Sequence, residues 1–266
     1  DQEHKLVVAT HTINRNDKNA LYAISQEAKE NIAVENLTVL ADKGYHTGKE
    51  LQACQEAGID TIVARQEVVN SNAKGTQPAY MVQHFIYNQA SDTYTCPEGQ
   101  TLQTTGRLHR KKRDEGVSYL FKKYRTSACL HCSVKDLCTG RHDGRREIER
   151  SEYAEAVERN KVNYEANASL YRQRQEINEH IFGTIKRQWN LYYTNLRGLE
   201  KVNGEVALIM LVYNMKRVQN ILGFKNLMEK LSKWTPKYPS GTLSSQNRLH
   251  KRFNQPMFFS TSLLCA

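Results

Sequence analysis

Short apolar runs and longer mixed segments alternate along the first 66 residues. The apolar runs are rich in β-branched residues and have the length of buried strands; they cover residues 5–10, 37–40 and 61–64. The mixed segments between them, at 18–29 and 47–57, have the start signals and apolar spacing of helices. The order strand, helix, strand, helix, strand predicts an α/β sheet with crossover helices.

A small β-rich segment is predicted next, after a polar linker. It spans residues 83–150 and contains four of the six cysteines. Its strand candidates are the runs 84–87, 92–95 and 117–121. Between them lies a strongly basic cluster at 107–113.

Two long helices are predicted in the last part of the chain, at 152–188 and 199–222. The first has an apolar stripe that repeats every four residues and consists of Ile177, Ile181, Ile185 and Trp189. The second is apolar on all sides at its centre, so we expect it to be buried. After Gly223 the chain is rich in Lys, Ser and Asn, which predicts a flexible basic tail.

Charge is unevenly distributed along the chain. Lys and Arg number 38 against 28 Asp and Glu, a net charge of +10. Residues 101–150 carry 13 basic and 6 acidic side chains, and residues 223–266 carry 7 and 1. This pattern suggests a polyanion such as nucleic acid as partner, although solvated surface lysines give the same composition. The longest apolar run, 207–213, is far shorter than the roughly 20 residues of a membrane span.

Four cysteines have the spacing of a zinc site. Cys129 and Cys132 form a CxxC pair, Cys138 follows, and Cys96 lies upstream. Two thiolates at this spacing can share one tetrahedral ion, and the other two complete a four-cysteine set. His131 or His109 could replace one ligand, and the alternative is a set of reduced, buried thiols.

Two further patterns could carry metal or phosphate chemistry. Asp42 comes directly after an apolar strand, where ligands gather in α/β sheets, but such an Asp is more often a turn or cap residue. In the helix, Arg172, Glu179 and Lys186 lie seven residues apart and therefore on one face. By spacing alone, an ordinary ladder of ion pairs explains this face as well as a site does.

Several motifs together resemble the DDE transposases of bacterial insertion sequences, over roughly residues 4–222. They are Val39–Tyr45 (VLADKGY), Glu179–Lys186 (EHIFGTIK), Leu196–Gly198 (LRG) and Tyr213–Arg217 (YNMKR). The cysteine-rich segment resembles an insert that one branch of these transposases carries.

The resemblance implies a ribonuclease H-like α/β fold with a mixed sheet, flanking helices and a small β-rich zinc-binding insert. We expect four parts: the first part of the core at 1–66, the insert at 67–150, a helical completion of the core at 151–222, and a basic tail at 223–266. It also implies metal-dependent DNA cleavage and strand transfer during transposition, in the bacterial cytoplasm, by a homodimer on DNA. Three carboxylates hold two Mg²⁺ ions in such a site, and hard Mg²⁺ prefers carboxylate oxygens.

By resemblance, Asp42 is the middle carboxylate and Glu179 the last. Lys186 would contact a DNA phosphate, with Arg172 and Arg174 as weaker candidates. The first Asp of the family has no counterpart in this sequence, so we expect an N-terminally truncated core with little or no activity of its own. The alternative is a non-catalytic, zinc-containing DNA-binding protein.

The spacing within the long helix leaves two choices for the last carboxylate. The family signature is Tyr-x2-Arg-x3-Glu-x6-Lys. Counted forward from Tyr171 and Arg174, the Glu position falls on Asn178; counted back from Lys186, it falls on Glu179. We favour Glu179, because Phe182, Gly183 and Lys186 fix the spacing locally.

Overall fold

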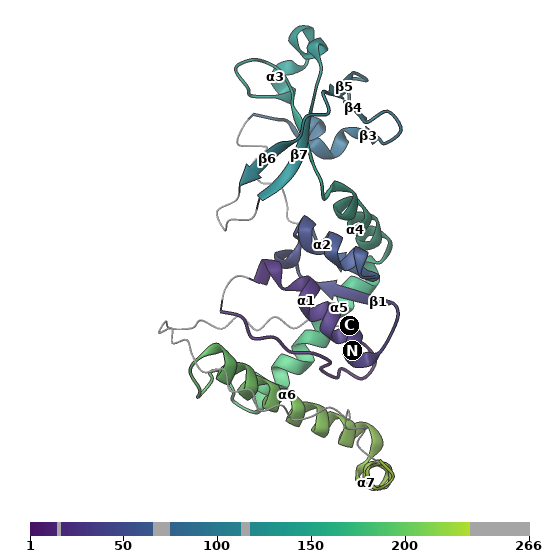
Figure 1. The fold of residues 1–266 in the computed structure, drawn as a ribbon, viewed down its shortest axis with the longest axis vertical. Coiled ribbons are helices and arrows are strands. Elements are labelled where there is room, and N and C mark those ends of the chain that lie inside the picture. The colour runs from purple at the N-terminus through teal and green to yellow at the C-terminus, as the bar shows by residue number, and fades with distance from the viewer. Residues whose placement is uncertain (15–16, 66–74, 113–117, 235–266) are drawn as a thin grey trace. The chain divides into compact units, whose positions relative to one another are not determined.

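The computed structural model describes residues 1–14, 17–65, 75–112 and 118–234. The chain forms two compact units, which are described separately: Asp1–Ala64 with Arg159–Ala266, and Arg65–Glu158. Together they contain helices, a parallel pair of strands and an antiparallel sheet, so the fold is mixed α/β (Figure 1).

The first unit begins with a small α/β arrangement. Strand β1 (Leu37–Ala41) pairs in parallel with β2 (Ile59–Val63), as predicted, from Leu37 opposite Ile59 to Ala41 opposite Val63. Helices α1 (Leu21–Ile32) and α2 (Gly48–Glu56) pack against each other, and α2 lies in the crossover connection from β1 to β2. Four of the five residues of each strand are buried, as expected for parallel strands covered by helices.

The strand predicted at 5–10 does not form. The backbone N–H of Val7 donates to Asn214 Oδ1 at 2.8 Å, and Asn214 Nδ2 donates back to the Val7 carbonyl at 2.7 Å. The side-chain amide of Asn214 thus occupies the backbone groups that a neighbouring strand would bind. Apolar, β-branched composition alone could not reveal this partner, which lies 207 residues away.

The helical part of the first unit follows residue 158. It consists of α4 (Ala154–Ala166, from Arg159), α5 (Ala168–Phe182), the π-helix η7 (Gly183–Gln188), α6 (Leu199–Leu222) and α7 (Phe224–Ser232). Asn160 fastens α4 to β2, because its amide donates to the Val63 carbonyl and accepts from the Val63 N–H at 2.8 and 2.9 Å. The buried cluster between α5 and α6 confirms the isoleucine stripe: Ile177, Ile181, Ile185, Val202, Val206, Met210 and Tyr213.

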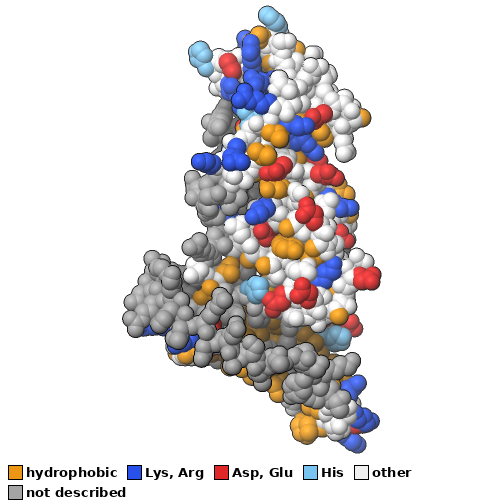
Figure 2. Space-filling view, in the orientation of Figure 1, with side chains coloured by type: hydrophobic (Ala, Val, Ile, Leu, Met, Phe, Trp, Pro, Cys, Tyr) orange, Lys and Arg blue, Asp and Glu red, His pale blue; other side chains and the backbone are white. Residues whose placement is uncertain are grey.

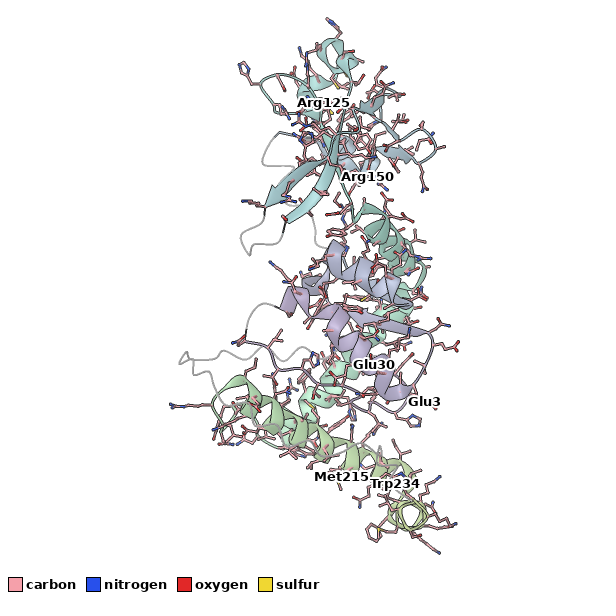
Figure 3. All side chains as sticks on the ribbon, viewed as in Figure 1. Glu3, Glu30, Arg125, Arg150, Met215 and Trp234 are labelled. Carbon is pink, nitrogen blue, oxygen red and sulfur yellow. The ribbon has the colours of Figure 1, made fainter. Side chains whose placement is uncertain are left out.

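Two expectations for the end of this unit are wrong. Helix α6 buries only one side: Leu208, Leu211 and Met215 are 65%, 53% and 62% exposed. Residues 224–232, expected to be a flexible tail, form the helix α7. Figure 3 shows Met215 and Trp234 extending from the α6–α7 segment. Residues 235–266 lie outside the described part of the chain.

The second unit is an antiparallel sheet with short helical turns. Its strands are β3 (Ile86–Asn88), β4 (Thr93–Thr95), β5 (Thr101–Thr104), β6 (His109–Lys112), β7 (Ser118–Arg125) and β8 (Ile148–Ser151). The order is β3-β4-β5-β7-β6, with β8 also paired to β7. The turns are η4 (Pro78–Tyr80), η5 (Val82–His84), η6 (Ser127–His131) and α3 (Lys135–Cys138). Phe85, Tyr94, Leu102, Tyr124 and Ile148 form its core. The prediction of a β-rich segment is therefore confirmed.

Among the described residues, no helix combines the length and the apolar character needed to cross a membrane.

Candidate functional site

Asp42 lies at the carboxyl end of β1, where the chain turns into the short 3₁₀ helix η2 (Lys43–Tyr45). Its side chain caps that helix by accepting the Lys43 N–H at 2.8 Å. The cap role that the sequence left open is thus present, and with 57% of its side chain exposed the carboxylate can still bind other groups.

Helix α5 packs against β1 and brings Arg174 to Asp42. The Arg174 Nη2 atom lies 3.7 Å from Asp42 Oδ1, and the Arg174 side chain is only 20% exposed. Its guanidinium stands 5.2 Å from the centre of the Tyr171 ring. Burial raises the pKa of Tyr171, Arg174 opposes that rise, and the Asp42 carboxylate adds to it. Asp42, Arg174 and Tyr171 therefore form one cluster.

Glu179 binds a neighbouring residue of its own helix, α5, and not this cluster. It is exposed, and its Oε1 accepts a hydrogen bond from Gln175 Nε2 at 2.9 Å. In the part of the chain that the structure describes, no three His, Cys, Asp or Glu side chains are arranged to hold a metal ion. Glu179 as a metal ligand therefore stays a prediction from the resemblance.

Lys186 lies in the π-helix η7, and its ammonium stands 5.3 Å from the centre of the Phe182 ring. It lines a pocket together with Tyr192 and Tyr193, which are 60% and 71% exposed. Exposed aromatic rings beside a cation suit contact with nucleic acid. Arg172, the weaker candidate, is exposed.

The four cysteines of the second unit meet at one pocket, which Cys96, Cys129, Cys132 and Cys138 line together. Burial raises the pKa of the Cys138 thiol; Arg146 lowers it, and the other three sulfurs raise it further. The donor set is thus assembled in one place, but the side chains as they stand form no metal-holding group among the described residues. Cys54 is buried in the first unit, which raises the pKa of its thiol to about 12.

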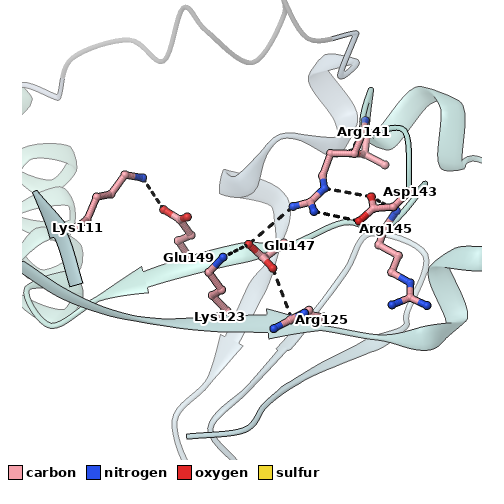
Figure 4. Close-up of polar contacts among 9 residues, drawn as sticks. Lys111, Lys123, Arg125, Arg141, Asp143, Arg145, Glu147 and Glu149 are labelled. Atoms are coloured by element: carbon pink, nitrogen blue, oxygen red, sulfur yellow. Dashed lines mark hydrogen bonds and ion pairs between the residues drawn. The ribbon is translucent and has the colours of Figure 1, made fainter. Parts of the chain in front are cut away.

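A network of cations covers part of the second unit (Figure 4). The Glu147 carboxylate, 12% exposed, receives Lys123 at 2.7 Å, Arg125 at 3.4 Å and Arg141 at 3.8 Å. One half-buried carboxylate thus binds three cations and leaves net positive charge at the surface. Figure 2 shows Lys and Arg side chains gathered over this unit.

Sequence reasoning missed a second polar centre, at Asp92. Its Oδ1 accepts the hydroxyls of Tyr124 at 2.6 Å and Tyr87 at 2.9 Å, and its Oδ2 accepts Lys122 Nζ at 2.7 Å. Asp92 has a φ of 49°, a left-handed conformation that Asp and Asn tolerate. An Asp at a hairpin turn is an ordinary turn signal, so nothing in the pattern singled it out.

Residues 95–219 match the family model of the transposase DDE domain. The resemblance to DDE transposases is thereby confirmed. The DDE match covers somewhat less than half of the chain; it includes the four clustered cysteines, α5 and most of α6, and leaves Asp42 outside. Searches of curated proteins and of solved structures find no similar protein.

Proposed function

We propose that this chain is a transposase-type DNA-handling protein whose own strand-cleaving activity is low or absent. The DDE transposase domain match carries the proposal of a transposase of the nuclease and strand-transfer class. Transposases of this class generally use Mg²⁺ to cleave and join DNA strands. The pairing of Asp42 with Arg174 supports low activity, because a guanidinium neutralises a carboxylate that a divalent ion would need.

The resemblance to DDE transposases assigns the metal ligands to Asp42 and Glu179. Carboxylate oxygens are the ligands that Mg²⁺ prefers, but the Arg174 guanidinium beside Asp42 competes with that ion in this chain. Within this chain, Lys186 would neutralise a phosphate of bound DNA.

DNA is proposed to bind along the cations of β6 and β7. Arg110 and Lys112 make no ion pair with any described residue, and Arg125 shares Glu147 with two other cations. These side chains are exposed, so their charge is available to phosphates. Each phosphate that they neutralise releases counterions, which makes the affinity dependent on salt.

The first prediction tests this surface by fluorescence anisotropy with duplex DNA between 50 and 200 mM salt, roughly the range over which such binding weakens. Replacing Arg110, Lys112 and Arg125 by Ala should lower the slope of log affinity against log salt by about two to three, near 0.9 per lost contact. The matched control replaces three exposed lysines elsewhere, Lys49, Lys161 and Lys201. Equal losses in both triple variants would mean that only net charge matters.

The alternative function is a zinc-containing DNA-binding protein with no catalytic role. Substituting Asp42 and Glu179 by Ala distinguishes this alternative from a transposase, because a non-catalytic protein should keep its DNA binding in both variants. Mg²⁺-dependent nicking of supercoiled DNA by wild type that is lost in both variants would support the catalytic hypothesis and overturn the proposal of low activity.

Zinc is proposed for the four cysteines, supported by their convergence on one pocket and by the preference of Zn²⁺ for thiolates. The second prediction is that native protein without chelator shows at most two reactive thiols, and that all six react only after a chelator has removed the metal and the protein is unfolded. Six reactive thiols before chelation would contradict zinc.

A homodimer is the proposed assembly on DNA. The exposed residues Leu208, Leu211, Val212 and Met215 on α6 have the i, i+3, i+4, i+7 spacing of a helix–helix seam. Such an apolar stripe is self-complementary in an antiparallel pair, so a second copy of the chain could cover it.

A further inference from the structure

One face of α5 lies toward Asp42, and Arg174 and Tyr171 identify it. Arg174 contacts the Asp42 carboxylate, and the charge of that carboxylate raises the pKa of Tyr171. With about 100° per residue, Asn178 lies about 40° from Arg174 and about 20° from Tyr171 around the helix axis. Asn178 is half-buried, as a position at this packed face should be.

Glu179 does not share this face. It lies about 140° from Arg174 around the helix, and its partner Gln175 stands on the preceding turn of the same exposed side. The next residue along the helix therefore carries the carboxylate away from Asp42, while position 178 carries an amide toward it.

The π-helix explains why the spacing in the sequence pointed to Glu179. In η7 the Trp189 N–H donates to the Thr184 carbonyl five residues back, at 3.0 Å. A turn with this bonding holds one residue more than an α-helical turn. Eight residues therefore separate Asn178 from Lys186 where an uninterrupted helix would need seven, and the extra residue belongs to the π turn.

The Arg174 guanidinium in this cluster lacks one hydrogen-bond acceptor. Among the described residues, the buried Nε of Arg174 has no hydrogen-bond partner. A divalent cation cannot accept that N–H, and it would meet a guanidinium beside the Asp42 carboxylate. The residues present therefore do not fit Mg²⁺.

We infer that Asn178 occupies the helix position opposite Asp42, and that Asp42, Arg174 and Asn178 form a polar cluster that excludes a divalent cation. The inference rests on the proposed function only in explaining why cleavage is low. Substituting Asn178 by Glu would supply the second carboxylate that the cluster lacks.

The test is a titration of the full chain with Mn²⁺, in which electron paramagnetic resonance measures the free ion. We expect wild type and Glu179→Ala to behave alike, with no saturable site. Asn178→Glu should gain one site at least about 10-fold tighter than any wild-type binding. The added Asp42→Ala substitution in that variant should remove the gain. The matched control is Gln173→Glu, which adds the same charge on an exposed position about 140° from Asn178 and should gain nothing.

Two results would overturn the inference. One is saturable binding by wild type that Glu179→Ala abolishes; the other is an equal gain in Asn178→Glu and Gln173→Glu. Trp189 fluorescence checks folding, since this ring packs against the α5–α6 core, and Asn178→Asp replaces the Glu variant if that one does not fold. Duplex binding in metal-free buffer is measured on the same samples, so that a protein that fails to bind DNA refutes the proposed function without touching the metal result.

Discussion

At the scale of single residues, Asp92 in the second unit accepts hydrogen bonds from one lysine and two tyrosines. Hydrogen bonds from Lys122 and Tyr124 lower its pKa from 3.8 to about 2, with Tyr87 adding to the effect. A carboxyl with a lowered pKa stabilises the fold above its unfolded pKa, and this contribution is lost as the pH falls through about 2. We predict that Asp92→Asn lowers the unfolding free energy of this unit by on the order of 1 kcal/mol at neutral pH, a figure reduced for partial exposure.

Amide hydrogen exchange in β4 and β7 measures the effect, because these strands carry Tyr94 and Tyr124 of the core. The difference between wild type and Asp92→Asn should shrink steadily as the pH falls from 4 toward 2. Asn keeps the left-handed backbone, so the comparison isolates the charge. Asp143→Asn is the control: its pKa is also lowered, by Arg141, but it lies outside this core and should leave both strands unchanged. A loss of protection as large at pH 2 as at pH 7 would refute the electrostatic explanation.

At the scale of elements, the two sides of α6 should respond differently to the same kind of substitution. Met210 is 5% exposed in the α5–α6 core, and removing its side chain leaves a cavity. For the monomer without DNA, we predict that Met210→Ala costs about 2–4 kcal/mol of unfolding free energy, and Leu208→Ala less than about 0.5 kcal/mol. Urea unfolding followed by Trp189 fluorescence measures both. A comparable cost at Leu208 would show that another surface covers this face in solution.

The sequence predicted those elements whose evidence is local. Strands β1 and β2, helices α1 and α2, and the isoleucine stripe all follow from period and length. The prediction of a strand at 5–10 was wrong because a strand needs a neighbouring strand. Here the side chain of the distant Asn214 bonds the backbone N–H and carbonyl of Val7 instead. The exposure of α6 failed for a related reason: apolar composition says that a face should be covered but not whether this chain covers it.

The candidate site divides in the same way. The position of Asp42 at a strand end, and the grouping of Cys129, Cys132 and Cys138, follow from local patterns. The face of α5 that meets Asp42 does not, because residue counting assumes an uninterrupted α-helix. The π turn of η7 adds one residue within the counted span, and only the backbone hydrogen bonds reveal it.

At the scale of the whole molecule, the net charge of +10 and the apolar stripe of α6 act in opposite directions on self-association. Like charges repel over about a Debye length, roughly 10 Å at 0.1 M salt, so added salt should favour pairing of the chains while it weakens binding of DNA. Duplex DNA should also favour pairing, because it neutralises the repelling cations.

The last prediction is that Leu211→Glu raises the dissociation constant of the dimer at least about 10-fold, because a carboxylate replaces a side chain at the centre of the stripe. Sedimentation velocity over a range of concentrations, with and without a short duplex, measures it. Asn220→Glu is the matched control: it adds the same charge on exposed α6 surface, about 120° from Leu208 around the helix, and should leave the constant nearly unchanged. Wild-type protein that stays monomeric at all concentrations, with DNA present, would refute the homodimer; equal weakening by both substitutions would assign the association to charge and not to the stripe.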